Sequence, residues 1–380
     1  MIPLMGYYPY LREIVLATSA MHLATHRRSK GLSTGAELVH ALSARQQAIR
    51  LLQAAMDNVT DDNRSAILAA VVFFVNFDLV DSGRGTWKVH LDAAGTLISA
   101  LYVRSEASSP SRQLFVPDQA MARLLDGVVA DCLTYHILGS ALTAVDGPAT
   151  SAYDSIDIAS VLHRAEAYSY HCCPPTILEI LVCATRLDCS RSQDTAPGLR
   201  GNKHDRTRLA TSLLQRALAF DVRGWVDNIP NLSTNDDREA RVRLASAHRA
   251  SACLFIILVL GPEVTHDADE RPNVEWLVEE ILQHLSCVPS DHALFKGSVW
   301  PSFMAGAQSD DAGQRQWCMR RLRAMWRSSP WACPWGYVES AMVTLESVWA
   351  ARDALPLAGK ESWNWLKQLR ETGNIDCLIV

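Results

Sequence analysis

The sequence predicts an all-α protein, a large array of antiparallel helix pairs packed into one body. Apolar residues recur at spacings of three and four along most of the chain, which is the period of an amphipathic helix, and strand-like alternation is scarce. The chain has 380 residues, 48% of them hydrophobic, which is enough for a large core. We expect one domain over residues 1–380. The loop at 188–205 is the candidate boundary if that domain has two lobes.

Three helices are predicted in the N-terminal part. The first covers about residues 11–28. The second covers about 36–57, and its apolar residues repeat at spacings near 3.6: Leu38, Leu42, Ile49, Leu52 and Met56. The third covers about 62–80 and follows Thr60 and two aspartates, which suit a helix start. Because this third helix is apolar on all sides, we expect it at the centre of the protein.

A glycine turn and a further helix come next. Ser82-Gly83-Arg84-Gly85 is expected to end the third helix, because both glycines can adopt positive φ. The next helix starts near Thr86 and carries one apolar stripe: Trp87, Leu91, Ala94, Ile98 and Leu101. Gly95 in its interior costs about 1 kcal/mol relative to Ala, so we expect another helix to approach there. Residues 63–98 are therefore predicted to form a helical hairpin.

Loops and one long helix organise the middle of the chain. We predict loops at 105–117, 188–205 and 221–237, where Ser, Pro, Gly, Asn and Asp accumulate. Residues 245–260 are predicted to be a buried helix that stops at a Gly-Pro pair. The prolines after Cys172-Cys173 indicate the start of another helix. The last third carries most of the tryptophans, which at helical spacing are usually core residues.

Composition limits the classes of partner. The formal net charge is −5, whereas a duplex-binding module is normally basic on one face. The basic clusters 27–30 and 320–323 are short and are expected on solvated helix faces. We therefore expect no direct nucleic-acid contact from this chain. The most apolar runs, 67–77 and 253–260, are shorter than the ~20 residues of a membrane span, so they predict buried helices and no membrane partner.

The cysteines and the N-terminus indicate a reducing compartment. Ten cysteines are scattered along the chain, most of them in apolar helical contexts, where they resemble small core residues. Residues 1–4 show no charged segment followed by an apolar run and a cleavage site, so no secretory signal is expected. The predicted location is the nucleus or the cytoplasm.

Three parts of the sequence resemble one known family. Ala20-Met21-His22-Leu23 resembles the opening of the fungal-specific transcription factor regulatory domain, and the hairpin at 63–98 resembles its central signature. Trp300-Pro301, Gly306-Ala307, Arg315 and residues 349–353 together resemble its closing pattern. The resemblance covers about residues 10 to 370. It implies an all-α fold and regulation of transcription through ligand or partner binding.

The sequence departs from the family in one respect. In the family this domain follows six cysteines that bind two zinc ions and begin with the spacing Cys-x2-Cys-x6-Cys. No such spacing occurs here: Cys172 and Cys173 are adjacent, and Cys183 and Cys189 are separated by five residues. The family's direct reading of DNA is therefore not carried over to this chain.

No catalytic residue, metal site or cofactor is predicted. No Gly-x-Ser-x-Gly elbow, Walker loop or dinucleotide-binding glycine pattern occurs. His22 and His26 share a helical face, but the glutamate of the zinc-protease pattern is missing between them. The candidate ligand-binding residues are Trp87, His90 and Trp300. The alternative is that the tryptophans fill the core and that His90 hydrogen-bonds a neighbouring helix end, which is the commoner role.

Two function hypotheses remain. The first is a regulator of transcription that binds a small-molecule effector, a protein partner or a second copy of itself as a homodimer. The second is a domain of the same family recruited as an enzyme of secondary-metabolite biosynthesis, acting on an apolar small molecule by acid–base catalysis. The second hypothesis requires a deep, closed pocket with convergent polar groups and a histidine or acid of perturbed pKa.

Overall fold

The computed structural model describes residues 2–106, 119–143, 157–167, 169–193, 203–230, 232, 234–260, 273–327, 334–356, 363–372 and 377–380. Within these ranges the regular structure is helical, with one isolated β-bridge and no strand, so the all-α prediction is confirmed. The helices are α1 (Ile2–Tyr7), α2 (Pro9–Ser29), α3 (Gly35–Met56), α4 (Asp61–Asp81), α5 (Trp87–Glu106), α6 (Gln119–Thr143), α7 (Ile158–Ala165), α8 (Pro175–Gln193), α9 (Lys203–Leu218), α10 (Val222–Asp227), α11 (Asn235–Leu260), α12 (Val274–Ser286), η3 (Phe295–Ser298), α13 (Val299–Gln308), α14 (Ala312–Arg327), α15 (Gly336–Asp353) and α17 (Trp365–Glu371).

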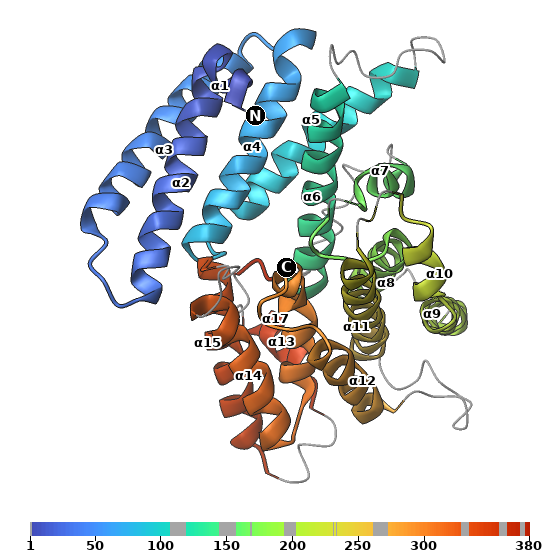
Figure 1. The fold of residues 1–380 in the computed structure, drawn as a ribbon. Helices are drawn as coiled ribbons and strands as arrows, with labels where there is room; N and C mark the ends of the chain where they lie inside the picture. The colour runs from blue at the N-terminus through green and yellow to red at the C-terminus, as the bar shows by residue number, and fades with distance from the viewer. Residues whose placement is uncertain are drawn as a thin grey trace.

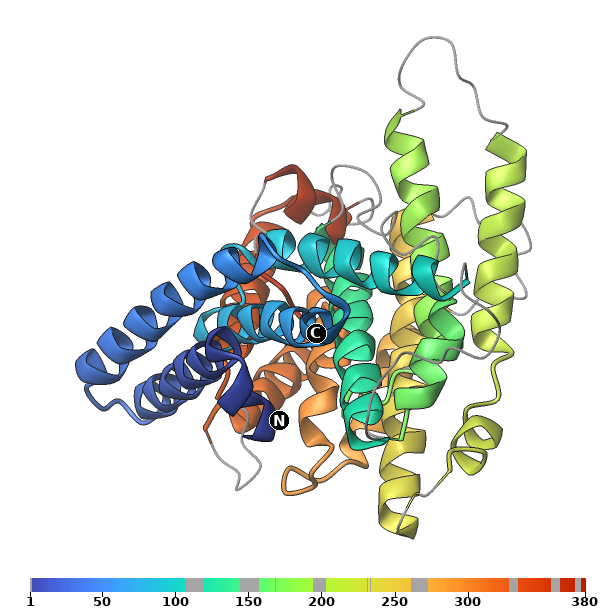
Figure 2. The ribbon, with the colours of Figure 1, turned by 90° about the horizontal axis from the view of Figure 1, so that it is seen from above.

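The N-terminal helices form a hairpin that packs against α4 (Figure 1). α2 and α3 run antiparallel, and α2 also lies along α4. Two threonines of α2 donate hydrogen bonds to carbonyls of α4: Thr18 to Phe73 over 3.4 Å and Thr25 to Val80 over 3.1 Å. The α2–α3 hairpin projects from the rest of the molecule, as the view from above also shows (Figure 2).

α4 starts and lies where the sequence predicts. Thr60 is its N-cap and forms a capping box with Asn63: the Asn63 amide donates to the Thr60 hydroxyl, and the Thr60 amide donates to the Asn63 side chain. Most of α4 from Ala66 to Val80 is buried, so its predicted central position is confirmed.

Two core helices are longer and more apolar than expected. Within the described chain, Asn63–Asp81 in α4 and Asp236–Val259 in α11 are long and apolar enough to cross a membrane by length and composition alone. Buried residues make up 72% and 78% of their apolar windows, respectively. Core helices of globular proteins pass the same test, and the burial predicted for both runs is confirmed.

α11 organises the second half of the protein, where it contacts α8, α9, α12 and α13 (Figure 1). It starts at Asn235, earlier than the predicted helix at 245–260. The loop predicted at 221–237 is partly wrong, because it contains the short helix α10. Asp221 caps α10 by accepting a hydrogen bond from the Gly224 amide over 2.9 Å, a start signal that the surrounding Asn and Pro residues obscured.

The other two predicted loops lie largely outside the described residues. α5 continues to Glu106, and residues 107–118 are not described. The loop predicted at 188–205 is wrong at both ends, because α8 continues to Gln193 and α9 begins at Lys203. Residues 194–202 between these helices are not described. The lobe boundary at 188–205 therefore stays a prediction.

The residues of the closing pattern meet on α13, α14 and α15. The Trp349 indole nitrogen donates to the Gly306 carbonyl over 2.8 Å. The guanidinium of Arg315 lies 5.6 Å from the centre of the Trp349 ring and binds both oxygens of Asp353. Arg352 forms an ion pair with Asp310. One aromatic ring and four charged groups thus hold the three helices together.

The basic cluster 320–323 is not a uniformly solvated face. Arg321 is buried: it donates to the Ser298 hydroxyl over 3.0 Å and to the Val288 carbonyl, and its guanidinium lies 4.3 Å from the centre of the Phe295 ring. Burial lowers the pKa of Arg321 to about 9. The sequence could not show this, because all of these partners lie outside α14.

We predict that Arg321→Ala destabilises the protein by about 2–3 kcal/mol, because it leaves the buried Val288 carbonyl and Ser298 hydroxyl without their donor. Arg320→Ala changes an exposed neighbour on the same helix and should stay within about 0.5 kcal/mol of wild type. Urea unfolding of both variants measures the difference. Equal losses for the two variants would contradict the assigned role of Arg321.

Candidate functional site

The turn between α4 and α5 depends on two glycines. We call residues 82–86 the hairpin turn. Gly83 has φ of 67° and Gly85 has φ of 101°, both in the left-handed region that the sequence predicted for them. A side chain on Gly83 would place its Cβ 2.5 Å from the Cβ of Tyr337 and 3.0 Å from the Leu378 carbonyl oxygen. Gly83 is therefore required by its backbone conformation and by the close approach of α15 and the C-terminal residues.

Three successive carbonyl groups at this turn accept hydrogen bonds from three separate parts of the chain. The Asp81 carbonyl accepts from Arg28 of α2 over 2.9 Å, and the Ser82 carbonyl accepts from the Ser340 hydroxyl of α15 over 2.7 Å. The Gly83 carbonyl accepts from the Leu378 amide over 2.7 Å. The C-terminus accordingly lies in the middle of the molecule (Figures 1 and 2). The turn thus joins the N-terminal and the C-terminal helices.

A polar cluster fastens α3 to the same turn. Asp78, near the end of α4, lies 3.5 Å from an Arg45 guanidinium nitrogen and accepts from the Thr86 hydroxyl over 3.2 Å. The His90 Nε2 atom lies 3.0 Å from the Thr86 oxygen and 3.9 Å from an Asp78 carboxylate oxygen. Three side chains, from α3, the turn and α5, therefore converge on one buried carboxylate of α4.

Burial sets the charge states in this cluster. Burial raises the pKa of Asp78 to about 6, while Arg45 and Thr86 oppose that rise. Burial and the neighbouring Arg45 lower the pKa of His90 to about 4, and its ring stacks on Phe74 with centroids 5.2 Å apart. Near neutral pH the cluster therefore contains a carboxylate, a guanidinium and a neutral imidazole. Such a cluster holds α3, α4 and α5 together and has a structural role.

Trp87 and Trp300 occupy different neighbourhoods. Trp87 is buried beside Gly139 of α6, where an added Cβ would lie 3.3 Å from the Trp87 ring and would collide with Leu378. Trp300 is fully buried on α13 and stacks on His248 of α11, with centroids 5.8 Å apart. Both tryptophans pack in the core. The ligand-binding role of Trp87, His90 and Trp300 stays a prediction.

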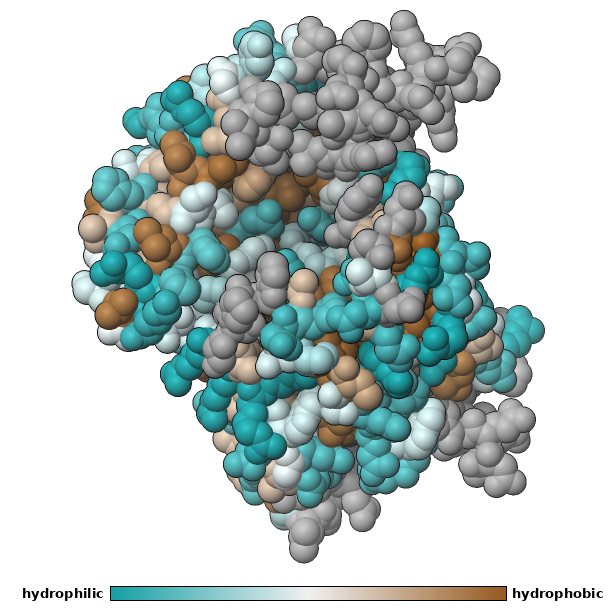
Figure 3. Space-filling model, in the orientation of Figure 1, coloured by the Kyte–Doolittle hydropathy of each residue, from teal (hydrophilic) through white to brown (hydrophobic). Residues whose placement is uncertain are grey.

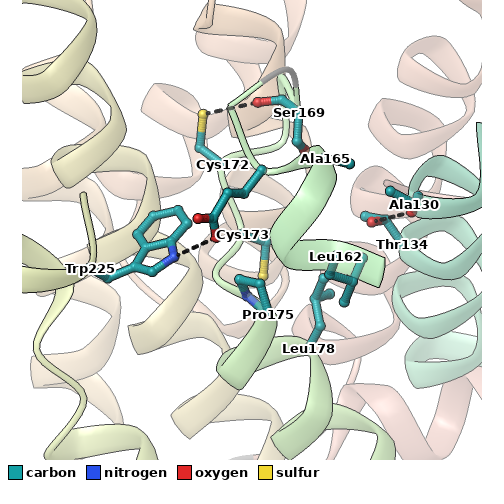
Figure 4. Close-up of a pocket in the computed structure, with 11 residues that line it drawn as sticks. Ala130, Thr134, Leu162, Ala165, Ser169, Cys172, Cys173, Pro175, Leu178 and Trp225 are labelled. Carbon is teal, nitrogen blue, oxygen red and sulfur yellow. Dashed lines mark hydrogen bonds between the residues drawn. The ribbon is translucent and has the colours of Figure 1, made fainter. Parts of the chain in front are cut away.

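A small cavity lies elsewhere, between α6, α7, α8 and α10 (Figure 4). Its volume of about 10 Å³ is room for roughly one water molecule. At its edge the Trp225 indole donates to the Glu166 carboxylate over 3.0 Å. The figure shows the thiols of Cys172 and Cys173 pointing to opposite sides, and burial raises the pKa of Cys172 to about 11. These thiols are not set up as a reactive pair.

Arg241 is an anchor that the sequence analysis did not identify. It is buried on α11 and donates to three backbone carbonyls just after α7: Glu166, Ala167 and Ser169. It thereby supplies hydrogen-bond donors to the backbone carbonyls at the C-terminal end of α7. A basic residue within an apolar helix was the available signal, but its partners lie more than seventy residues away in the sequence. Among the described residues, no group of three or more His, Cys, Asp or Glu side chains could hold a metal ion.

Comparison with known families identifies the architecture. The model of the family described as fungal specific transcription factor domain matches residues 1–379. The chain belongs to this family. The predicted resemblance is confirmed, and the hairpin of α4 and α5 lies within the matched range.

Two curated relatives of this domain are regulators by name. The acriflavine sensitivity control protein acr-2 of Neurospora crassa is 45% identical over the whole chain, which covers 62% of that protein. Sterol uptake control protein 2 of Saccharomyces cerevisiae is 30% identical over 27% of the chain and 12% of that protein. The chain thus spans less than two thirds of the length of either relative. No solved structure matches it.

We predict that Gly83→Ala destabilises the fungal transcription factor domain by about 3 kcal/mol or more, because backbone strain and a steric clash add together. Gly31→Ala is the matched control: Gly31 has φ of 71°, but nothing lies within 4 Å of an added Cβ. It should cost only about 1 kcal/mol. Thermal unfolding of both variants tests the close packing at the turn. Similar losses of stability in the two variants would refute that packing.

The burial of His248, whose ring stacks on Trp300, predicts that the stability of the protein depends on pH. Burial lowers the pKa of His248 from 6.5 to about 4 in the folded protein. Below pH 6.5 the unfolded chain takes up a proton on this histidine before the folded protein does. The protein therefore loses about 3 kcal/mol of stability as the pH falls from 6.5 toward 4. His248→Gln should be less stable than wild type at pH 7, and that gap should narrow at pH 4.5. A gap independent of pH in urea unfolding would contradict this assignment.

Proposed function

We propose that this chain is the regulatory part of a transcription regulator, and that effector or partner binding acts by changing the packing around the hairpin turn. Membership of the fungal transcription factor domain family and the names of the two relatives support the regulatory role. The observation that carries the mechanism is the set of three successive carbonyls that accept from α2, α15 and Leu378.

This geometry couples the two ends of the chain. A ligand shifts a conformational equilibrium only by binding one state better than the other. Any movement of α2 and α3 relative to α15 breaks these hydrogen bonds or crowds Gly83 and Gly336. A Cβ added at Gly336 would collide with the Asp81 carbonyl. The packed turn therefore favours two discrete arrangements over gradual sliding. A signal received on one side is transmitted to the other through the turn.

The binding partners and the location are part of the proposal. The ligand is a small-molecule effector, a protein partner or a second copy of the chain. Contact with DNA is supplied by another segment or another protein. The place of action is the nucleus or the cytoplasm, and the family description as a transcription factor domain supports the nucleus.

The enzyme hypothesis is not favoured. It required a deep pocket with convergent acid–base groups. The cavity in Figure 4, which lies among the described residues, is too small for a substrate because it holds about one water molecule. His90 is engaged by Thr86 and Phe74, and burial lowers its pKa to about 4, below the range of an effective base near neutral pH. The relatives are named as control proteins.

The whole chain fused to an unrelated DNA-binding domain should change the output of a matched reporter gene in fungal cells. Ser340→Ala removes the donor to the Ser82 carbonyl, worth about 1 kcal/mol, and should shift that output about fivefold. Val343→Ser, at an exposed position of the same helix, is the control and should leave the output unchanged. A fusion that leaves the reporter at the level of the DNA-binding domain alone would contradict the proposed function.

A further inference from the structure

Residues 377–380 form a short apolar segment in the interior of the protein, and we call them the strap. Their sequence is Cys-Leu-Ile-Val, and each of the four residues is at most 2% exposed. They form neither a helix nor a strand. The visible face of the protein is mostly hydrophilic, in contrast to this run of four apolar side chains (Figure 3). The hydrophobic effect therefore favours the position of the strap in the core.

The strap pairs with the hairpin turn through its backbone. The Leu378 amide donates to the Gly83 carbonyl over 2.7 Å, and Cys377 forms the isolated antiparallel bridge with Arg84. On the other side, the Cys377 sulfur lies 4.0 Å from the hydroxyl oxygen of Thr344 in α15. An extended segment that adds its backbone to another one in this way is a common mode of peptide recognition.

Two glycines leave the room that the strap fills. A Cβ added to Gly139 of α6 would collide with the Leu378 side chain and would lie 3.3 Å from the Trp87 ring. A Cβ added to Gly83 would lie 3.0 Å from the Leu378 carbonyl oxygen. The turn, α5, α6 and α15 therefore form one site that is shaped for this extended apolar segment.

The strap is held differently from the helices around it. A residue within a helix is tied to its neighbours by the hydrogen bonds of that helix, so helices open cooperatively. The strap is joined to the turn by the bridge and by the packing of its side chains, so its release exposes four residues and breaks no helix. Proteins open such short segments at a lower free energy than they unfold as a whole.

We propose that the strap is an intramolecular peptide ligand, which docks on and leaves the site at the hairpin turn, Trp87 and Gly139 while the helices stay folded. The class of ligand that this site takes is an extended apolar peptide paired with the backbone of residues 83–84. Release of the strap removes the donor to the Gly83 carbonyl, one of the three carbonyls that join the two ends of the chain. This inference deepens the proposed function and rests on it only for its effect on transcription.

Thiol labelling of the folded full chain measures the release, because Cys377 belongs to the strap and is 1% exposed. Cys253 of α11 and Cys318 of α14 are the internal references, since both are 0% exposed within helices. The purified chain is alkylated with N-ethylmaleimide in native buffer, and mass spectrometry of its peptides follows each cysteine with time. Cys377 should react about tenfold faster than either reference, or more, because the strap opens without global unfolding.

Two glycine variants of α6 test the site itself. Gly139→Ala should raise the labelling rate at Cys377 about tenfold further and leave both references unchanged, because the added methyl group takes the space of the Leu378 side chain. Gly127→Ala is the matched control on the same helix, where nothing lies within 4 Å of an added Cβ, and it should label like wild type.

The proposal is overturned if Cys377 of the wild-type chain reacts no faster than the two references, since the strap then opens only when the whole protein unfolds. It is also overturned if the two glycine variants label alike, or if Gly139→Ala accelerates all three cysteines equally. Circular dichroism verifies that each variant is folded, and the wild-type comparison decides the proposal even where a variant is not. Labelling rates do not depend on transcription, so failure here is distinct from failure of the reporter test.

Discussion

The structure depends on the need to satisfy three adjacent peptide carbonyls where α4 ends. The donors for Asp81, Ser82 and Gly83 come from α2, from α15 and from the C-terminal residues; the bond to Asp81 is exposed and the bond to Ser82 is partly buried. Only glycine allows the chain to turn with φ of 67° and still leave room for Tyr337 and Leu378. Elements separated by hundreds of residues are thus fixed against one short turn.

Our proposed mechanism of regulation rests on this constraint at the hairpin of α4 and α5. Asp78 extends the same junction to α3 through Arg45, and to α5 through Thr86 and His90. His90 follows the same logic: burial lowers its pKa to about 4 and its ring stacks on Phe74, so near neutral pH it is a neutral, packed group and no general base.

The sequence predicted features that local chemistry determines. The capping residue Thr60, the central helix and the positive φ of Gly83 and Gly85 all follow from residue type and spacing, and all are found. The closing pattern of the family resemblance stays a prediction, and in the structure its Arg315 and Trp349 pack against each other.

What could not be predicted depends on distant partners. Arg321 reads as a surface residue until Phe295 and Ser298 enclose it, and nothing in the sequence near Gly83 reveals Leu378. For the same reason Trp87 and Trp300 were candidates for a ligand site on residue type alone, whereas their position in the core depends on α6 and α11. The spacing predicted the apolar stripe on α3, but it could not predict that Leu42 and Met56 stay exposed, because periodicity cannot tell which helix lies at an edge.

Hydrogen–deuterium exchange of Gly336→Ala against wild type tests the coupling most directly. The added methyl would press on the Asp81 carbonyl from the start of α15, on the C-terminal side of the junction. If the turn couples the two sides, amides at the C-terminal ends of α2 and α4 should lose protection together with those of α15. Loss of protection confined to α15, with α2 and α4 unchanged, would contradict the account.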